Sequence, residues 1–209
     1  KLSWALRHGA NEIDLNIQPD GFVPISELLS KKKFKGTNVD SIIEVVENCP
    51  KNRFSIKQDE SGQLFIRANQ GHSLKSVESN ELLTQIERSS DISLCAHGTY
   101  KRFWPQILSS GALLPMSRNH VHFSTFLPVE KLKPEGEKRA AQEISGMRKN
   151  AEIIIVVNVE RAMEMGIKFY RSENGVVLVK KGLPLSCVES VIDRTCNDKE
   201  IFKNGKLVL

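Results

Sequence analysis

The hydrophobic pattern of this chain changes near residue 93, and that change limits the folds that the chain can adopt. Upstream, apolar residues recur at helical spacing, as in VDSIIEVVENC from residue 39, and two apolar runs then flank the turn DESG at 59–62. Helices followed by a β-hairpin are typical of a winged helix. Downstream, short apolar strands such as 152–158 alternate with helices or loops. The predicted parts of this α+β protein are a lobe at 1–75, a linker at 76–92 and a second lobe at 93–209.

Local signals predict where single elements begin and end. Ser26 and either Thr37 or Asn38 are expected to cap two helices, because their side-chain oxygens accept hydrogen bonds from a first helical turn. Gly111 is expected to end a helix that starts near residue 102, because glycine readily adopts a left-handed backbone. These signals favour short helices in both predicted lobes.

The composition favours a reduced, intracellular protein with enough apolar residues for a core. Of 209 residues 40% are hydrophobic, and no apolar run approaches the roughly 20 residues of a membrane span. The four cysteines are too scattered for a disulfide framework or a zinc ribbon. The net charge of +5 permits an anionic partner, but both predicted lobes share the excess. An argument for an anion site must therefore rest on individual arginines and not on the net charge.

The run SRNHVHF at 117–123 concentrates polar side chains where a strand is expected to begin. His120 and His122 are two residues apart, so on a strand they share one face, as a pair of zinc ligands would. No residue has an obvious spacing to supply a third ligand. Ser117 and Arg118 point instead to anion recognition, because a planar guanidinium matches a phosphate group. A metal site, an anion site and a polar turn stay open on this run alone.

Other stretches are also ambiguous when taken alone. Arg7 and His8 stand near a helix end, where the helix dipole stabilises cations, and Arg53 opens a predicted strand. RANQGHS at 67–73 fits an anion-binding turn or an ordinary polar turn, and the glycine of AHGTY at 96–100 permits close approach of a ligand. The chain has no G-x-G-x-x-G and no Walker motif, so a bound dinucleotide would not use a Rossmann fold.

Taken together, these stretches occur in one order from the first residues to about Leu185. The motifs are LRHG, DGFVPISELL, RFSIK, ANQGHS, HGTY, MSRNHVHF, ISGMR and FYRSENGV. Their joint pattern is far more specific than any single motif. It resembles the tRNA 2′-phosphotransferase family, the NAD-dependent enzymes that remove a 2′-phosphate from RNA.

The resemblance implies an N-terminal winged-helix lobe, a C-terminal ADP-ribosyltransferase-like lobe of mixed α/β structure, and an active site in the cleft between them. It also implies two chemical steps. The RNA 2′-phosphate first displaces nicotinamide from NAD⁺, and a ribose hydroxyl of the attached ADP-ribose then attacks the phosphate. The products would be RNA with a 2′-hydroxyl, nicotinamide and ADP-ribose 1″,2″-cyclic phosphate.

The resemblance also implies site residues at the positions that match the family's motifs. The Arg-His-Arg-Arg catalytic set corresponds to Arg7, His8, Arg53 and Arg118. The residues expected to bind NAD⁺, as a co-substrate, are His97, Gly98, Thr99, Ser117, Asn119, His120, His122, Arg148, Arg171 and Ser172. No metal is expected, because clustered guanidiniums can stabilise a charged phosphoryl group.

Some regions depart from the family pattern or admit two explanations. The charged segment 130–143 resembles an insertion, and the tail from Cys196 matches nothing in the family. KKKFK at 31–35 is either a phosphate contact or a solvated loop.

The expected partners are RNA with a 2′-phosphate, such as tRNA, and NAD⁺, with no membrane. We expect a monomer in the cytoplasm, or in the nucleus of a eukaryote. Two alternatives stay open. One is an ADP-ribosyltransferase that acts on a terminal nucleic-acid phosphate or another acceptor, and the other is a non-catalytic winged-helix module that binds RNA.

Overall fold

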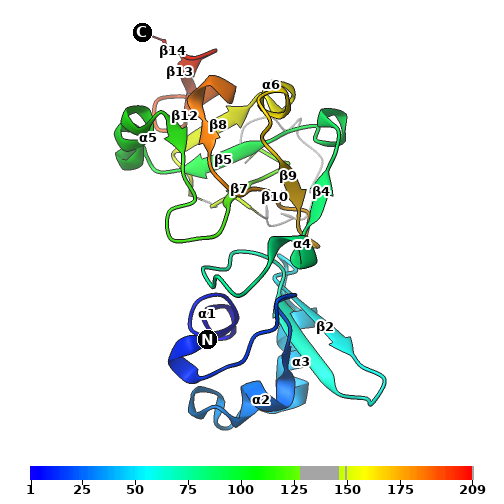
Figure 1. The fold of residues 1–209 in the computed structure, drawn as a ribbon. Coiled ribbons are helices and arrows are strands. Elements are labelled where there is room, and N and C mark those ends of the chain that lie inside the picture. The colour runs from blue at the N-terminus through cyan, green and yellow to red at the C-terminus, as the bar shows by residue number, and fades with distance from the viewer. Residues whose placement is uncertain (128–145, 149, 209) are drawn as a thin grey trace, which may run out of the picture. The chain divides into compact units, whose positions relative to one another are not determined.

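The computed structural model describes residues 1–127, 146–148 and 150–208, so the predicted insertion at 130–143 lies outside the described residues. The chain divides into two compact units (Figure 1). The first unit consists of Lys1–Thr84, Ser117–Asn119 and Ser172–Asn174. The second unit consists of the described residues within Gln85–Met116, His120–Arg171 and Gly175–Leu209.

The first unit packs short helices on a small antiparallel sheet with the strand order β1-β3-β2. Its strands are β1 (Val23–Pro24), β2 (Phe54–Gln58) and β3 (Leu64–Ala68). Its α-helices are α1 (Leu2–Arg7), α2 (Ile25–Ser30), α3 (Val39–Glu47) and α4 (Ser79–Leu82), and its 3₁₀ helices are η1 (Asn11–Ile13) and η2 (Lys32–Phe34). Helices α1 and α2 contact β3, and α3 contacts β2, so the sheet carries the core of this unit.

Turn and cap chemistry explains the hairpin and α3. The carboxylate of Asp59 accepts hydrogen bonds from the backbone N–H groups of Ser61 (3.0 Å) and Gln63 (2.8 Å), which closes the turn between β2 and β3. The side chain of Asn38 accepts from the N–H of Ser41 at 2.9 Å, as an N-cap does. The predicted hairpin and the predicted cap at Asn38 are confirmed.

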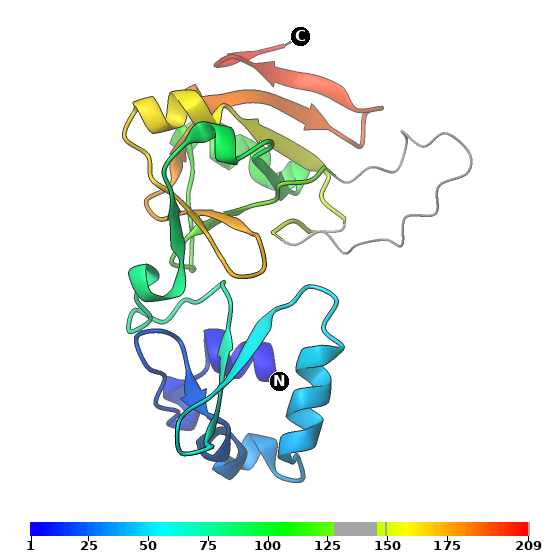
Figure 2. The ribbon, with the colours of Figure 1, turned by 90° about the vertical axis from the view of Figure 1, so that its right-hand side faces the viewer.

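The second unit contains sheets with the strand orders β14-β13-β12-β8-β5, β4-β9-β10-β7 and β11-β6. Figure 2 shows β12 and β13 side by side near the C-terminus. The strands are β4 (Thr84–Ile86), β5 (Ala96–Thr99), β6 (Ala112–Leu113), β7 (Val121–Phe123), β8 (Ile153–Val157), β9 (Phe169–Arg171), β10 (Val177–Val179), β11 (Leu183–Pro184), β12 (Val188–Asp193), β13 (Lys199–Lys203) and β14 (Lys206–Leu207). The helices are α5 (Trp104–Ser110), α6 (Val159–Glu164), η3 (Ser89–Asp91), η4 (Lys101–Phe103) and η5 (Leu185–Cys187).

The strands β5 and β7 line the core of the second unit. The core includes the fully buried side chains of Phe123 on β7 and Ile153 on β8. A bridge between Ala96 and Ser124 joins the start of β5 to the chain that leaves β7. The segments that carry HGT and HVHF are therefore neighbours in space, although they are about 25 residues apart in the sequence.

The structure of the second unit also tests several predictions made from the sequence. Gly111 follows α5 with φ at 68°, so the predicted helix stop is confirmed. The tail from Cys196 forms the hairpin β13–β14, in which Asn204 and Gly205 take φ values of 45° and 86°. The predicted mixture of helices and sheets is confirmed. Within the described ranges, we find no helix with the length and apolar character needed to cross a bilayer.

Candidate active site

Helix α1 presents Arg7 in its last turn and His8 at its C-cap. A Cβ at Gly9 would lie 2.2 Å from the ring of Trp4, so no other residue fits there without a shift of that ring. Glycine at this position therefore allows the backbone to pass close to the Trp4 ring where the chain leaves α1, directly after Arg7 and His8.

The guanidinium of Arg7 is a buried cation with unfilled hydrogen-bonding capacity. Its Nε and Nη2 atoms are buried and have no hydrogen-bond partner among the described residues. Burial, and then the charges of Arg118 and Arg53, lower its pKa to about 10 against a smaller opposing effect of Cys49. Arg7 still carries its charge at neutral pH. A buried charge with free donors in a positive environment is suited to bind an anion.

His8 is held by a serine from the turn after β3. Its Nδ1 lies 2.9 Å from the Ser73 hydroxyl oxygen, and that hydroxyl donates to the carbonyl of Arg7 at 3.4 Å. The tautomer in which the Ser73 hydroxyl donates to this carbonyl carries the imidazole proton on Nδ1 and the lone pair on Nε2. Burial, followed by the charges of Arg118 and Arg7, lowers the pKa of His8. The imidazole is therefore neutral at pH 7 and is ready to accept a proton.

Arg53 stands directly before β2 and contacts a cysteine that sequence reasoning missed. The Cys49 sulfur accepts from the backbone N–H of Arg53 at 3.5 Å and from its Nη1 at 3.4 Å. Burial alone would raise the pKa of the Cys49 thiol, but hydrogen bonds from Arg53 and from the backbone of Lys51 outweigh burial and lower it. A single sequence carries no signal for this contact, because an isolated cysteine is usually a core residue.

Arg118 reaches the first unit on a short loop, Ser117–Asn119. Asn119 holds this loop, because its backbone N–H donates to the carbonyl of His72 at 2.9 Å and its side-chain amide donates to the carbonyl of Leu74 at 2.9 Å. The preceding residue, Met116, has φ at 57° and is 82% exposed, an unusual backbone conformation for a side chain of this kind.

The four predicted catalytic residues thus belong to one unit, and the charge of Arg118 acts on both Arg7 and His8. Three guanidiniums near one neutral imidazole form a strongly positive environment. A doubly charged phosphate group would relieve their mutual repulsion.

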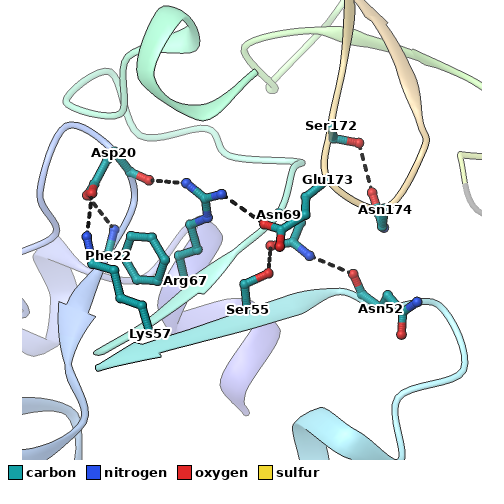
Figure 3. A network of polar contacts seen from close by, with 10 residues as sticks. All are labelled: Asp20, Phe22, Asn52, Ser55, Lys57, Arg67, Asn69, Ser172, Glu173 and Asn174. Atoms are coloured by element: carbon teal, nitrogen blue, oxygen red, sulfur yellow. Dashed lines mark hydrogen bonds and ion pairs between the residues drawn. The ribbon is translucent and has the colours of Figure 1, made fainter. Parts of the chain in front are cut away.

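A second short loop, Ser172–Asn174, also belongs to the first unit (Figure 3). The Ser172 hydroxyl donates to the Asn174 side chain at 2.8 Å, and the Asn174 amide donates to the carbonyl of Lys51 at 2.9 Å. Glu173 pairs with Arg67 at 2.9 Å, and that hydrogen bond is the main reason why the pKa of Glu173 is lowered. Ser172, a predicted NAD⁺ ligand, is 3% exposed, and its hydroxyl takes part in this network of hydrogen bonds.

In the second unit, His97 and Gly98 lie on β5 in a closely packed environment. His97 donates from Nδ1 to the carbonyl of His122 at 2.8 Å, which leaves its Nε2 as an acceptor. A Cβ at Gly98 would lie 2.5 Å from Met147 and 2.8 Å from Ala151. Glycine is required here for packing, whatever ligand approaches the strand.

The other predicted NAD⁺ ligands of the second unit are polar side chains with protein contacts. Burial, followed by the charge of Lys180, lowers the pKa of His120 to about 4, so this side chain is neutral at pH 7. Arg148 lies over the ring of Tyr100 at 5.0 Å, and Arg171 donates to the carbonyl of Asp91 at 2.6 Å.

The ten predicted NAD⁺ ligands are divided between the two units. Ser117, Asn119 and Ser172 belong to the first unit, and the other seven belong to the second. Their binding roles stay predictions. Among residues 1–127, 146–148 and 150–208, no group of three or more His, Cys, Asp or Glu side chains is arranged to hold a metal ion.

Comparison with known proteins gives the family. A family model described as "RNA 2'-phosphotransferase, Tpt1 / KptA family" matches residues 1–181. The chain is 42% identical over 179 residues to "tRNA 2'-phosphotransferase 1" of Danio rerio, covering 85% of this chain and 74% of that protein. For the Homo sapiens protein of the same name, identity is 39% over 178 residues, covering 85% and 66%. For "tRNA 2'-phosphotransferase" of Saccharomyces cerevisiae, identity is 35% over 196 residues, covering 91% and 80%.

These matches extend over most of the chain and include every motif from Arg7 to Ser172. The chain therefore belongs to the RNA 2'-phosphotransferase, Tpt1 / KptA family of enzymes, and the family predicted from its motifs is confirmed.

Proposed function

We propose that the protein removes an internal 2′-phosphate from RNA, typically from ligated tRNA, by transferring it to NAD⁺. Membership in the phosphotransferase family supports this function, and so do the names of the relatives. The observation that carries the proposal is the buried and charged guanidinium of Arg7, which feels the charges of Arg53 and Arg118. Two of its nitrogens have no hydrogen-bond partner among the described residues. Such a site fits a dianionic phosphate ester.

The finer architecture is part of this proposal. Helices α1 to α3 with the hairpin β2–β3 form a winged-helix lobe, for which we retain the bounds 1–75. The linker is 76–92, and the second lobe, 93–209, has an ADP-ribosyltransferase-like fold and supplies most of the NAD⁺ contacts. The cytoplasm, or the nucleus in a eukaryote, would be the location that matches a tRNA substrate.

The first chemical step needs no general base, because the 2′-phosphate is already an anion at neutral pH. A phosphate oxygen bonds to the anomeric carbon of the nicotinamide riboside, and the bond from that carbon to the pyridinium nitrogen breaks. The electron pair of the broken bond neutralises nicotinamide as it leaves. Arg7, Arg53 and Arg118 orient the phosphate for this attack, which is the effect of positioning two reactants.

The second step forms a bond from a ribose hydroxyl to phosphorus and breaks the bond from phosphorus to the RNA 2′-oxygen. The three guanidiniums stabilise the charge that develops on the phosphoryl oxygens. His8 is suited to accept the hydroxyl proton at Nε2, because its lowered pKa keeps the imidazole unprotonated at neutral pH and its Nδ1 faces Ser73. The protonated imidazole then supplies that proton to the departing 2′-oxygen.

The test is incubation of a 2′-phosphorylated oligoribonucleotide with NAD⁺, followed by gel analysis of the RNA and assay of free nicotinamide. Arg118→Ala or His8→Ala should stall the reaction at ADP-ribosylated RNA or slow it by roughly 100- to 1,000-fold. Arg88→Ala is the matched control, because the Arg88 side chain is 76% exposed and pairs with Asp91 in the same surface turn.

Two outcomes would contradict the proposal. One is nicotinamide release that does not require the 2′-phosphate, since the 2′-phosphate is the nucleophile of the first step. The other is complete reaction with RNA that carries only a terminal phosphate, which would favour an ADP-ribosyltransferase of nucleic-acid ends instead.

A further inference from the structure

The segment 69–74, which follows β3, contacts the chain at or beside each of the four predicted catalytic residues. A Cβ at Gly71 would lie 3.5 Å from Arg7 Nη1, and the N–H of Ser73 donates to the carbonyl of Arg7 at 3.0 Å. The Ser73 hydroxyl lies 2.9 Å from His8. We call residues 69–74 the organising segment. Two asparagines connect it to the remaining two arginines.

Asn69 connects the organising segment to Arg53 through two neighbouring carbonyls. Its backbone N–H donates to the carbonyl of Arg53 at 2.9 Å. Its side-chain amide donates to the carbonyl of Asn52 at 2.8 Å, as Figure 3 shows. Its side-chain oxygen accepts from Ser55 at 2.7 Å. Asn69 is 2% exposed, so its hydrogen bonds are made in a water-poor environment where losing them is costly.

The backbone before Arg53 needs such support. Asn52 has φ at 43°, in the left-handed region that side chains other than glycine adopt at a cost. Asn174 adds a third amide, which donates to the carbonyl of Lys51 at 2.9 Å. Three consecutive carbonyls, those of residues 51 to 53, therefore accept hydrogen bonds from asparagine N–H groups, and these bonds fix the direction in which Arg53 leaves the backbone.

Asn119 makes the same kind of two-point contact beside Arg118. Its backbone N–H donates to the carbonyl of His72, and its side-chain amide donates to the carbonyl of Leu74, both at 2.9 Å. The resemblance of the motifs predicts Asn119 as an NAD⁺ ligand, but both of these donor groups are directed to the organising segment.

We propose that Asn69 and Asn119 are positioning residues that hold Arg53 and Arg118 beside Arg7. The inference rests on the proposed function. Guanidiniums of like charge repel one another, so a cluster of three disperses unless the backbone that carries them is held in place. Each asparagine joins one arginine-bearing segment to the organising segment, which itself holds Arg7 and His8. The four catalytic groups are thus arranged by one element.

The decisive experiment is a pair of double-mutant cycles with single-turnover rates at saturating NAD⁺. Asn69→Ala should slow the reaction by roughly 100-fold in the wild-type background, as expected when a catalytic group is displaced by about 1 Å. In the Arg53→Ala background the same change should cost less than about threefold, because the residue it positions is gone. Asn119→Ala should behave in the same way with Arg118→Ala.

Controls separate positioning from folding. Asn48→Ala is the matched variant, because the Asn48 amide also donates to a backbone carbonyl, that of Glu44 at 3.0 Å, without touching the organising segment. It should leave the rate unchanged. Thermal unfolding of every variant establishes the folded fraction. If Asn69→Ala does not fold, Asn69→Asp preserves the shape and the bond from Ser55 while it removes the donor to Asn52.

Equal losses from Asn69→Ala in the presence and absence of Arg53 would overturn the inference, since a merely structural residue acts additively. Binding of 2′-phosphorylated oligoribonucleotide, measured by fluorescence anisotropy without NAD⁺, provides a readout independent of turnover. Asn69→Ala should weaken that binding roughly tenfold only when Arg53 is present. Inactive wild-type protein would count against the proposed function, whereas active wild-type protein with unimpaired asparagine variants would count against this inference alone.

Discussion

Burial lowers the pKa of Arg7 in the first unit and of His120 in the second unit, but it leaves the two side chains in different charge states at neutral pH. Burial and neighbouring cations lower the pKa of Arg7 only to about 10, so it stays charged at neutral pH. Burial lowers the pKa of His120 to about 4, so it becomes neutral. The same physical effect therefore leaves a buried cation in one unit and a buried neutral imidazole in the other.

The difference matters because the two proposed substrates carry opposite charges where they react. A phosphate group is attracted by guanidiniums, whereas the pyridinium ring of NAD⁺ is itself a cation and would be repelled by them. A neutral imidazole such as that of His120 can contact a cationic ring without this penalty. A cationic Arg7 and a neutral His120 are thus each compatible with one substrate of the proposed reaction.

The largest predicted effect comes from removing charge in the first unit. Arg7→Gln should lower kcat by roughly 100- to 1,000-fold, because a buried donor to the developing phosphoryl charge is lost. Arg148→Gln, which changes an arginine of the second unit, should instead raise the KM for NAD⁺ with a smaller change in kcat. Steady-state kinetics with varied NAD⁺ measure both constants. Equal effects of the two variants on kcat would remove the distinction between the two regions.

The next effect is a pH dependence of stability in the second unit. Because the pKa of His120 is lowered on folding, the unfolded chain binds more protons below pH 6.5, and stability falls as the pH decreases toward 4. The loss is at most about 3.5 kcal/mol, from about 1.4 kcal/mol per pKa unit. Urea unfolding of wild type and His120→Gln at pH 7 and pH 4.5 measures it.

The comparison of the two proteins separates the contribution of His120 to the pH dependence from that of the carboxylates, which also lose stabilising contacts in acid. His120→Gln should lose less free energy of unfolding between the two pH values than wild type does. Identical losses would mean that the buried imidazole is not neutral in the folded protein.

Local elements were predictable where one residue type determines the backbone. Asn38 caps α3, and Gly111 ends α5, because side-chain acceptors and left-handed glycines act over only a few residues. The predicted cap at Ser26 is wrong. Helix α2 begins at Ile25, preceded by Pro24, and the Ser26 hydroxyl accepts from Gln63 at 3.4 Å instead. Pro24 marks the start of α2, and the prediction considered only polar N-cap residues.

The candidate site was predictable only in part. The ionisable residues of the site could be identified from the order of the motifs, because the charge of a side chain is determined by its residue type. The contacts of the organising segment were not predictable, since they join positions 16 to 66 residues apart through backbone carbonyls whose directions no local pattern records. The roles of Asn69 and Cys49 therefore required the folded chain, although the motif ANQGHS already contained one of them.

The smallest predicted effect compares two buried thiols. Cys49→Ala removes the sulfur that accepts two hydrogen bonds from Arg53. Sulfur is a weak acceptor, so we expect a loss of about 0.5–1 kcal/mol, or roughly two- to fivefold in kcat. Cys95, which is 1% exposed in the second unit and whose pKa is raised by burial, belongs to the hydrophobic core.

Cys95→Ala should reduce the free energy of unfolding by about 1 kcal/mol through lost packing and leave kcat unchanged. Cys49→Ser, which restores a small acceptor beside Arg53, should recover part of the lost activity. If Cys95→Ala lowers kcat as much as Cys49→Ala does, the loss reflects general loosening of the fold. In that case the cysteine beside Arg53 has no specific part in holding the guanidinium, and the precision of the cluster depends on the asparagines alone.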